Sequence, residues 1–365
     1  MSTLKTDALG SVDFPQDVLV DGTARPKRVA TSSGTAPSYP ANGDVWHDTG
    51  KDAVKILVAE NWYTVTAIKM NLGIGERGVY AGGVGSSATE IIDYITISTP
   101  SNATDFGDTT DANWYHTAGL SDGSRGVIGG GSTGRSQITY ITIATAGNAS
   151  SFGSLHSPTR QHAAASNDVR GLFIGGMDTG SGLKNHIQYI TIATTGDAAD
   201  FGDLTTSRRF LAATAGGSRA VTGGGWDSGG RANTMDYVEI ATTGNATDFG
   251  DLTEVKGYMA AASDGTLGLF AGGNPNSNSP INTIEKITLA TPANAVDFAD
   301  IHTATQYHAA ASNGTNAVWG GGTGSSGGSN STNQLQTNVI ATGGNGTDFG
   351  NLTDARRQLA GFSGN

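Results

Sequence analysis

Residues 235–251, with the sequence MDYVEIATTGNATDFGD, contain the pattern that decides the fold. Residues 235–241 alternate between apolar and polar side chains, which is typical of a half-buried β-strand. A Thr-Thr-Gly-Asn turn follows at residues 242–245, and another short strand begins after it. Upstream, residues 210–214 and 220–222 are two further apolar runs, and the second leads into a triple glycine. The unit therefore contains four short strands, which we call A, B, C and D in chain order.

This unit occurs six times along the chain. Each copy has a phenylalanine followed by glycine or alanine in its D strand, and successive phenylalanines are 46 to 51 residues apart. A repeat of this length with several short strands is typical of a propeller blade, and the alanine-rich A strands fit the crowded axis. The sequence therefore predicts an all-β fold, a six-bladed β-propeller with four-stranded blades. The phenylalanines are Phe106, Phe152, Phe201, Phe249, Phe298 and Phe349, and a pair of glycines ends each B strand at Gly82, Gly130, Gly175, Gly224, Gly272 and Gly321.

The two ends of the repeat region complement each other. The first unit begins with a B strand at residues 78–83 and has no convincing A strand before it. Residues 357–363 match an A strand, and no B strand follows them. We therefore expect the C-terminal strand to complete the first blade, which closes the ring and removes two exposed strand edges.

Residues 1–76 do not share the repeat. Residues 31–42 are rich in Ser, Gly, Pro and Ala, which is typical of a linker. Three short β-like runs follow around Trp46 and Trp62, and a meander of this size is too small to fold well alone. The sequence predicts two parts: an N-terminal arm, linker and small β-rich anchoring module at 1–76, and the propeller at 77–365.

Composition excludes several classes of function. The net charge is −11 and no basic stripe occurs, so we expect no nucleic-acid partner. The chain contains no cysteine, which excludes disulfides and thiolate metal sites. No run of eighteen apolar residues is present, and residues 1–10 lack the apolar core of a signal peptide. We therefore expect neither membrane insertion nor a signal peptide.

Two resemblances to known families add to this interpretation. The repeats resemble a divergent kelch-type propeller in the diglycine that ends strand B and in the blade length. The segment GDVW at residues 43–46, with VKI at 54–56 and Asn61-Trp62, resembles a short module of phage tail and fibre proteins. The opening MSTLKTD is similar to the start of tail-fibre proteins of cyanobacterial phages. These resemblances imply a homo-oligomeric virion protein, made in the host cytoplasm, whose residues 1–76 bind other tail proteins and whose propeller meets the host.

One set of polar residues points to the central channel. We expect the residue that opens strand A, and the residue two positions before it, to lie near one mouth of the channel. This set could bind an anionic sugar or an ion, or it could be a polar lining that water satisfies. Its candidate ligand-binding members are His162, Arg209 and His308. The opening residues are His116, His162, Leu211, Met259, His308 and Leu359, preceded by Trp114, Arg160, Arg209, Gly257, Gln306 and Arg357.

The loops suggest which face carries function. Strands alternate in direction, so the B–C loops and D–A connections share one face, and the A–B and C–D turns share the other. The turns are short and similar, whereas the B–C loops vary in length and composition, as recognition loops on a constant scaffold do. Drift of unconstrained loops would give the same variation. Within these loops Trp226, beside Asp227 and Arg231, can stack on a sugar ring. We expect no structural duty for Trp226.

The chain shows no motif for catalysis. Asp-Phe-Gly recurs without the other kinase motifs, and the glycine runs lack the Lys-Ser/Thr of a P-loop. The seven histidines lack metal-ligand spacing, so we expect no metal, cofactor or catalytic residue. Aspartates of the D strands could bind Ca²⁺ or make Asx turns; they are Asp105, Asp108, Asp248, Asp251, Asp297 and Asp300.

The preferred hypothesis is therefore a non-enzymatic phage virion protein of the tail or fibre, with one propeller face that recognises a host-surface glycan or protein. Two alternatives stay open at this point. One is a purely structural tail or capsid decoration protein without a host ligand. The other is a glycan-degrading enzyme, which needs two carboxylates at a defined separation.

Overall fold

The computed structural model describes residues 75–275, 279–324 and 330–364, together with the bounds of eight strands nearer the N-terminus. The chain divides into two compact units, Met1–Lys69 and Met70–Asn365. Every regular element is a strand in the part of the chain that the structure describes. In that part, no helix is long and apolar enough to cross a membrane.

The N-terminal unit contains the predicted meander of three strands. Strands β6, β7 and β8 pair antiparallel in sequence order. Residues 31–33, predicted as the start of a linker, instead form β5, which pairs parallel to β6. The assembly role predicted for residues 1–76 stays a prediction. The strands are β1 Lys5–Thr6, β2 Val12–Asp13, β3 Val18–Val20, β4 Thr23–Arg25, β5 Thr31–Ser33, β6 Val45–Asp48, β7 Ala53–Val58 and β8 Asn61–Thr64.

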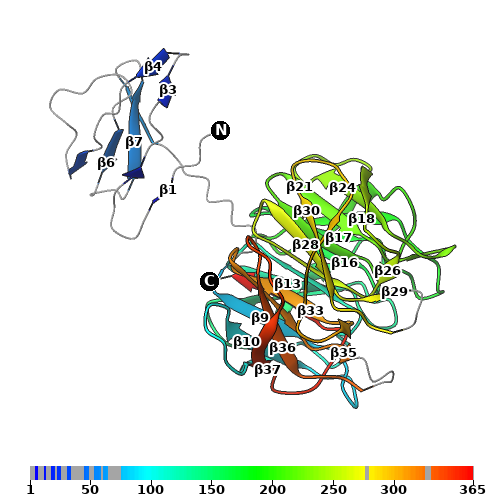
Figure 1. The fold of residues 1–365 in the computed structure, drawn as a ribbon. Coiled ribbons are helices and arrows are strands. Elements are labelled where there is room, and N and C mark those ends of the chain that lie inside the picture. Colours follow the sequence, from blue (N-terminus) through cyan, green and yellow to red (C-terminus); the bar gives the residue numbers. More distant parts are fainter. Residues whose placement is uncertain are drawn as a thin grey trace. The chain divides into compact units, whose positions relative to one another are not determined.

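The second unit is a six-bladed β-propeller, which confirms the predicted fold class (Figure 1). Each blade is a four-stranded antiparallel sheet, and we number the blades I to VI along the chain. In the order A, B, C, D the strands are as follows: blade I, β38 Ala360–Gly364, β9 Arg77–Ala81, β10 Ile91–Thr96 and β11 Thr104–Asp108; blade II, β12 Ala118–Ser121, β13 Arg125–Gly129, β14 Gln137–Thr142 and β15 Ser150–Ser154; blade III, β16 Ala163–Ser166, β17 Arg170–Ile174, β18 His186–Thr191 and β19 Ala199–Asp203.

The remaining three blades follow the same plan. Their strands are: blade IV, β20 Ala212–Gly216, β21 Arg219–Gly223, β24 Thr234–Glu239 and β25 Thr247–Asp251; blade V, β27 Ala260–Ser263, β28 Leu267–Ala271, β30 Thr283–Thr288 and β31 Val296–Asp300; blade VI, β33 Ala309–Ser312, β34 Asn316–Gly320, β36 Gln334–Val339 and β37 Thr347–Asn351. Short two-residue strands add three small ladders on the D–A and B–C side: β22 Trp226–Asp227 with β23 Gly230–Arg231, β26 Lys256–Gly257 with β29 Asn274–Pro275, and β32 Thr305–Gln306 with β35 Thr323–Gly324.

The C-terminal strand closes the ring, as predicted. Strand β38 pairs antiparallel with β9, so that Ala360 lies opposite Ala81 and Gly364 opposite Arg77. Its first residue, Ala360, lies three positions after the start that the sequence suggests. Blades I and VI consequently lie side by side (Figure 1).

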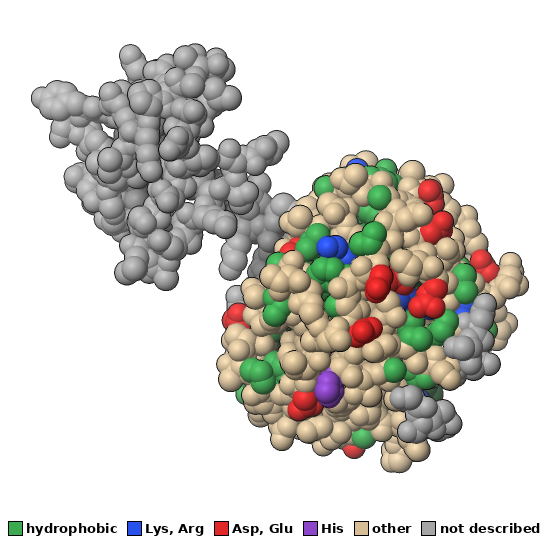
Figure 2. All heavy atoms as spheres, in the orientation of Figure 1, with side chains coloured by type: hydrophobic (Ala, Val, Ile, Leu, Met, Phe, Trp, Pro, Cys, Tyr) green, Lys and Arg blue, Asp and Glu red, His purple; other side chains and the backbone are tan. Residues whose placement is uncertain are grey.

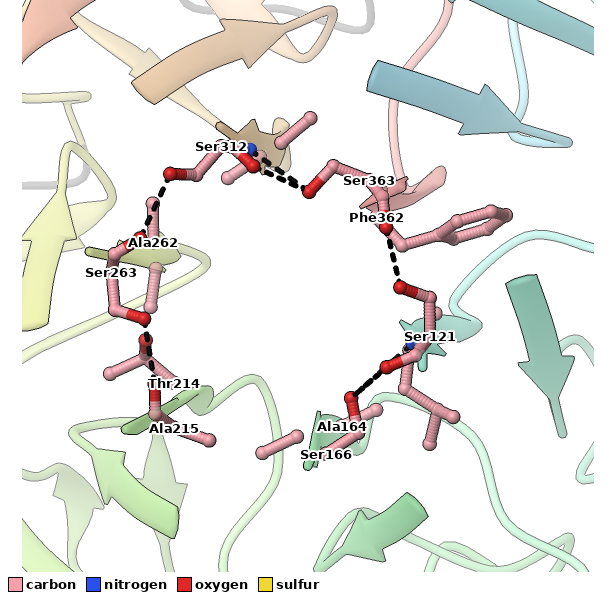
Figure 3. Close-up of a pocket in the computed structure, with 17 residues that line it drawn as sticks. Ser121, Ala164, Ser166, Thr214, Ala215, Ala262, Ser263, Ser312, Phe362 and Ser363 are labelled. Atoms are coloured by element: carbon pink, nitrogen blue, oxygen red, sulfur yellow. Dashed lines mark hydrogen bonds between the residues drawn. The ribbon is translucent and has the colours of Figure 1, made fainter. Parts of the chain in front are cut away.

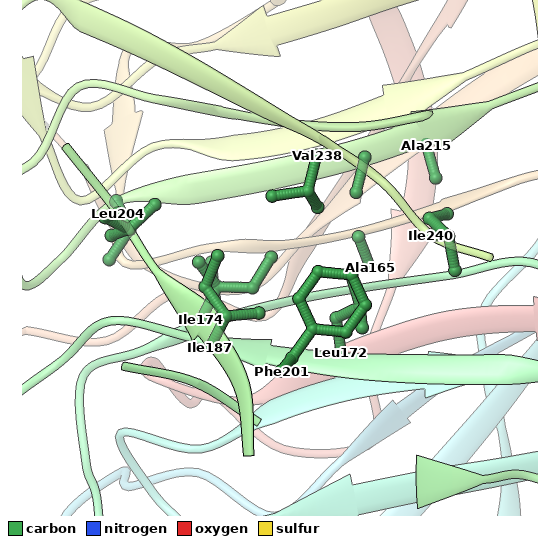
Figure 4. Packing of buried hydrophobic residues seen from close by; sticks show 12 residues of the cluster. Ala165, Leu172, Ile174, Ile187, Phe201, Leu204, Ala215, Val238 and Ile240 are labelled. Atoms are coloured by element: carbon green, nitrogen blue, oxygen red, sulfur yellow. The ribbon is translucent and has the colours of Figure 1, made fainter. Parts of the chain in front are cut away.

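Apolar side chains of the strands pack between neighbouring blades. Six separate clusters of buried residues occupy the six interfaces between blades. At the interface of blades III and IV, Leu172, Ile174 and Phe201 face Val238 and Ile240 (Figure 4). Each such side chain stabilises the fold by roughly 1.5–3 kcal/mol when it is fully buried. The core is therefore a ring of six interfaces, and each depends on both of its blades.

The Asp-Phe-Gly repeat is a docking point between blades. Gly202 has a φ of +148°, and a Cβ atom there would lie 2.4 Å from the carbonyl oxygen of Gly244 in the next C–D turn. In the same turn Asn245 Oδ1 accepts the Asp203 N–H at 3.0 Å, and the Ala246 N–H donates to the Asp203 carbonyl at 2.7 Å. This repeat is therefore a structural turn.

The acidic side chains spread over the propeller face seen in Figure 2 lie among many uncharged ones.

Candidate functional site

Each D–A connection places one residue in the left-handed backbone region. Twenty-four glycines in the described residues have a positive φ, but only eight other residues do. Six of these eight occupy the same position in the six blades, two residues before the first residue of strand A. We call these six residues the left-handed ring: His116 (φ 58°), Gln161 (60°), Phe210 (56°), Tyr258 (65°), Tyr307 (60°) and Gln358 (60°). For a residue with a Cβ atom this conformation costs about 1–2 kcal/mol.

A closed circle of backbone hydrogen bonds holds the left-handed ring. Each ring residue donates its N–H to the carbonyl oxygen of the ring residue in the preceding blade, at 2.8 to 3.0 Å. The circle closes across the chain ends, because His116 donates to Gln358 and Gln358 donates to Tyr307. Glycine would make the same hydrogen bonds without the strain. The backbone therefore explains the conformation, but it does not explain why all six positions carry a side chain.

Aromatic side chains of the left-handed ring meet over the mouth of the channel. The ring of Tyr258 lies 4.3 Å from Phe210 and 4.3 Å from Tyr307, measured between centroids. His116, from the other side of the mouth, lies 5.7 Å from Phe210 and 6.5 Å from Tyr307. Burial and the neighbouring Tyr258 raise the pKa of Tyr307. Four half-buried rings from blades II, IV, V and VI thus cap this mouth.

A small cavity lies beneath the left-handed ring. Its volume is about 80 Å³, which leaves space for roughly two or three waters at ~30 Å³ each. Sites that enclose a small-molecule ligand usually measure about 300 Å³ or more. The cavity is therefore too small to enclose a ligand of sugar size. Below the ring, the cavity is lined by the residues that open the A strands: Thr117, His162, Leu211, Met259, His308 and Leu359.

The predicted histidines His162 and His308 belong to this lower layer. Each is only 6% exposed, and each packs edge-on against an aromatic ring, Phe173 at 5.7 Å and Trp319 at 6.1 Å. Burial lowers the pKa of both imidazoles to about 4. The two side chains are therefore neutral parts of the packing at pH 7, beneath the surface that a ligand would touch.

The predicted alignment of blade II is wrong by one residue. Its D–A connection is one residue longer than the others, so Thr117, not His116, is equivalent to His162. Thr117 donates its hydroxyl to the Gly129 carbonyl at 2.8 Å. His116 occupies the left-handed position, and the residue before it is Tyr115. Counting back from the alanine of strand A, instead of forward from Phe106, would have found this shift.

Three arginines precede ring residues: Arg160 in blade III, Arg209 in blade IV and Arg357 in blade I. Burial, together with the charges of Arg160, Arg357 and Arg209, lowers the pKa of His116 to about 4. Among the described residues, Arg160 and Arg209 have no carboxylate partner. The cavity lining contains no acidic residue. This mouth of an acidic protein is therefore cationic.

The structure places the predicted Arg209 beside the aromatic cluster. Its guanidinium carbon lies 5.1 Å from the ring of Phe210 and 5.6 Å from that of Trp226. Its Nη1 donates to Gln161 Oε1 at 3.4 Å and contacts Met177 Sδ at 3.1 Å. Arg209 thus connects the left-handed ring to the B–C loop of its own blade.

Trp226 has a structural role, contrary to the expectation from the sequence. Its backbone pairs with that of Arg209 in both directions, at 2.7 and 2.9 Å. Its half-buried indole lies 5.7 Å from Tyr258, and a Cβ atom on Gly257 would come within 2.8 Å of it. Replacing Trp226 therefore disturbs the packing of the mouth as well as any ligand contact.

Asp227 and Arg231 complete the small β22–β23 hairpin that Trp226 begins. The Arg231 guanidinium lies 4.6 Å from the Trp226 ring, and its Nη2 donates to Asn274 Oδ1 of blade V at 2.8 Å. Asp227 Oδ1 accepts the Gly229 N–H at 2.7 Å, which is a turn contact. The structure therefore joins Trp226, Arg231 and Arg209 to the left-handed ring, whereas Asp227 serves its own turn.

The opposite mouth of the channel is lined by serines (Figure 3). Five of the six blades have a serine near the end of strand A. Each serine hydroxyl donates to the carbonyl oxygen of the equivalent residue in the preceding blade, at 2.5 to 2.8 Å. Ala215 of blade IV interrupts the circle. We call this set the serine ring: Ser121, Ser166, Ser263, Ser312 and Ser363. Its hydroxyl protons are already used within the protein.

The described residues include no group of three or more His, Asp or Glu side chains that could hold a metal ion. The calcium alternative therefore has no cluster to support it in this part of the chain. The D-strand residues Asp108 and Asp251 use their backbone N–H groups to bind Asn148 and Asn294 of the next blade, each at 3.0 Å.

The arrangement as a whole offers a half-buried aromatic surface and two arginines without a carboxylate partner among the described residues, Arg160 and Arg209, at one mouth. At the other mouth the serine hydroxyls bind backbone carbonyls of the protein itself. A scan against protein-family models finds no match to this chain, and a search of curated proteins finds none either.

Proposed function

We propose that the protein is a non-enzymatic virion protein of a phage tail or fibre, and that its propeller recognises a host-surface glycan or protein. The recognition surface is the face of the D–A connections and B–C loops. The phage assignment and the kelch-type relationship of the blades rest on the short sequence resemblances described above. The structure adds an independent reason to place recognition on this face.

The observation that carries the proposal is the left-handed ring. The chain uses glycine at most left-handed positions, yet none of the six ring positions has one. The strain of six such residues amounts to several kcal/mol, at about 1–2 kcal/mol each. Backbone strain of this kind clusters at functional sites, where the surrounding structure maintains it. The ring side chains also differ between blades, which is unnecessary for a purely structural closure.

The position of the chain ends supports a division of labour between the two faces. Residue Gly75, where the described part of the propeller begins, lies against Gly364, and Gly364 lies against Gly123 in the A–B turn of blade II. The chain therefore enters the propeller on the face of the serine ring. The anchoring that we propose for residues 1–76 and the recognition that we propose for the left-handed ring therefore involve different faces at the point where the described chain begins.

A binding role is favoured over glycan hydrolysis by the absence of acids at the site. Glycoside hydrolysis generally needs two carboxylates on either side of the scissile bond. None of the residues lining the cavity under the ring is Asp or Glu. The titratable groups there are three histidines, His116, His162 and His308, all neutral at pH 7, and two tyrosines. These groups bind and orient a ligand but do not form an acid–base pair of that kind.

Adsorption of the purified full chain to cells tests the proposal. Fluorescently labelled protein is incubated with a panel of cyanobacterial cells, and the bound fraction is measured by flow cytometry. We expect binding to some strains, reduced at least about tenfold by Tyr258→Gly, because an aromatic anchor contributes about 0.5–1.5 kcal/mol beyond its buried area and several copies act together.

The matched control is Ser263→Ala in the serine ring, which should leave adsorption unchanged. Absence of binding to any strain, or equal loss in both variants, would contradict recognition by the left-handed ring. Immunogold labelling of purified particles locates the protein separately, and labelling confined to the capsid would rule out a tail position.

A further inference from the structure

We propose that the left-handed ring binds a sugar that carries an anionic substituent, with the anion held by Arg160, Arg209 and Arg357 and the sugar ring lying on the aromatic cluster. This inference rests on the proposed function and specifies the class of its ligand. Four observations lead to it: the convergence of charge, the missing acidic partners, the aromatic surface and the size of the cavity.

The three arginines converge on the mouth of the channel. Arg357 and Arg160 belong to blades I and III, on either side of His116 in blade II, and both charges act on the His116 imidazole. Arg357 and Arg209 also act on the phenol of Tyr307 in blade VI. Each of the three arginines directly precedes a residue of the left-handed ring, and Arg209 Nη1 donates to Gln161 Oε1 of the neighbouring blade, so the three lie around this mouth.

The fully buried cations among the described residues have acidic partners. Arg208, next to Arg209 in sequence, pairs with Asp236 at 2.5 Å, and Lys256 pairs with Glu285 at 2.6 Å. By contrast, Arg209 reaches only Gln161 and Met177, and the buried Nε of Arg160 has no hydrogen-bond partner among the described residues. A guanidinium left without a carboxylate in a half-buried site is ready to bind one from outside.

The aromatic cluster supplies the surface for the body of the sugar. Phe210, Tyr258 and Tyr307 lie within 6 Å of one another and are half-buried, so their outer faces stay accessible. Sugar C–H groups pack on such faces, while hydroxyls bind the tyrosine oxygens and the amides of Gln161 and Gln358. Neutral aromatic contact alone would accept many sugars, so the arginines determine the selectivity.

The cavity volume fixes how the sugar lies. A space of about 80 Å³ accepts a substituent or a few waters but not a whole sugar ring. The sugar therefore lies flat across the left-handed ring with its anionic group toward the arginines of blades I, III and IV. A carboxylate of a uronic or sialic type and a sulfate ester both match guanidinium geometry, because each presents two oxygens to a planar fork.

The experiment compares charged glycans with their neutral counterparts. Binding of the full chain is measured by isothermal titration calorimetry against oligogalacturonate, its carboxyl-reduced form, sulfated galactan and desulfated galactan. In at least one of these two pairs we expect the charged glycan to bind and its neutral counterpart to bind at least about tenfold more weakly. The reason is that hydrogen bonds to a charged group contribute more than those to a neutral one. The pair that responds distinguishes a carboxylate from a sulfate.

Variants of the arginines identify the site. Arg160→Gln combined with Arg209→Gln should weaken binding about tenfold or more and reduce its dependence on salt. The matched control, Lys184→Gln, removes a charge from a B–C loop on the same face, where Lys184 pairs with Asp178 at 2.9 Å, and should bind like the wild type. Thermal unfolding of each variant establishes that it is folded.

The outcomes separate the two proposals. If neutral and charged glycans bind equally, or if the double variant binds like the wild type, the anionic-sugar inference is wrong while cell adsorption through Tyr258 can still stand. If no glycan binds but a peptide with a free C-terminal carboxylate does, the ligand is a protein and this inference is overturned. If neither cells nor glycans bind, both proposals fall.

Discussion

At each mouth of the propeller channel a circle of hydrogen bonds connects neighbouring blades, but the two circles are built differently. The serine ring repeats one residue type in five blades and satisfies each hydroxyl with a carbonyl of the neighbouring blade. The left-handed ring closes with backbone hydrogen bonds alone and carries His, Gln, Phe, Tyr, Tyr and Gln. Uniform residues at the first mouth indicate a constraint of structure. At the left-handed ring the side chains vary although the backbone is strained, so structure alone does not explain them. We propose that ligand binding does.

Removal of residues 356–365 should have the largest effect, because it breaks both rings at once. The deletion removes Gln358 and Ser363, exposes the edge of β9, and leaves Asp93 buried without Arg356, its partner at 2.9 Å. We expect loss of the cooperative unfolding transition and aggregation through the free edge. Size-exclusion chromatography with light scattering and calorimetry measure this. A monodisperse truncated protein with an unchanged Tm would contradict closure by β38.

Breaking the ion pair under the left-handed ring should have the next largest effect. Arg208 binds Asp236 and the carbonyl of Gly224, and all of these groups are buried. Arg208→Thr leaves Asp236 unpaired and should cost about 3–5 kcal/mol in free energy of unfolding. Urea unfolding measures the loss.

A natural control for this pair exists in blade VI. There Gln336 donates to Thr305 at 3.2 Å in the equivalent place. Arg208→Thr with Asp236→Gln copies that arrangement and should recover at least half of the lost stability. A single variant that costs less than about 1 kcal/mol would show that the buried charge finds another partner.

Acid should destabilise the protein through the histidines beneath the left-handed ring. His162 and His308 have a pKa of about 4 in the folded protein, against 6.5 for an ordinary histidine. The unfolded chain therefore binds their protons first. Their contribution is complete above pH 6.5 and is lost as the pH falls toward 4, by up to roughly 3 kcal/mol for each histidine.

Leucine variants isolate this contribution from that of the carboxylates. Leu211 and Leu359 fill the same position in other blades, so His162→Leu with His308→Leu should fold and should lose less stability between pH 7.5 and pH 4.5 than the wild type. Thermal unfolding at both pH values gives the comparison. An identical pH dependence in both proteins would mean that the imidazoles accept protons in the folded state.

Changes in the serine ring should have the smallest effects, and these should have opposite signs. Ser263→Ala removes a hydroxyl that donates to the Ala215 carbonyl at 2.6 Å and should cost about 1 kcal/mol. Ala215→Ser supplies the missing sixth hydroxyl toward the Ser166 carbonyl and should stabilise by about 0.5–1 kcal/mol. Chemical denaturation resolves differences of this size. A loss of stability in Ala215→Ser would mean that the interruption at blade IV relieves crowding.

The sequence predicts the fold well because its signals are local and repeated six times. Alternating strands, alanine-rich inner strands and phased glycines each follow from backbone geometry and packing, and together they give the blade number and the closure by the C-terminal strand. The assembly role of residues 1–76 and the host ligand do not follow from geometry of this kind, and they stay proposals.

The candidate site was predicted only in part. Position alone brought Arg209, His162 and His308 to the channel, but no residue type shows that the intervening Phe210 has a left-handed backbone. His, Gln, Phe and Tyr rarely adopt that conformation, and the hydrogen bonds that enforce it come from other blades. The same reason explains the error at Trp226, whose partners Tyr258 and Gly257 follow it by more than thirty residues.

The closure by β38 also determines how this chain could be rewired. In blade II, Ser121 and Arg125 are joined by an Asp122-Gly123-Ser124 turn, and in blade I the break between Gly364 and Gly75 falls in the equivalent turn. A circular permutant that links these ends and opens the chain in another A–B turn would keep a strand shared across its closing blade. One opened in a D–A connection would leave every blade continuous and hold its last interface only by the contacts between blades, without a shared strand. The difference between their unfolding rates would measure how much closure by a shared strand increases the kinetic stability of the propeller.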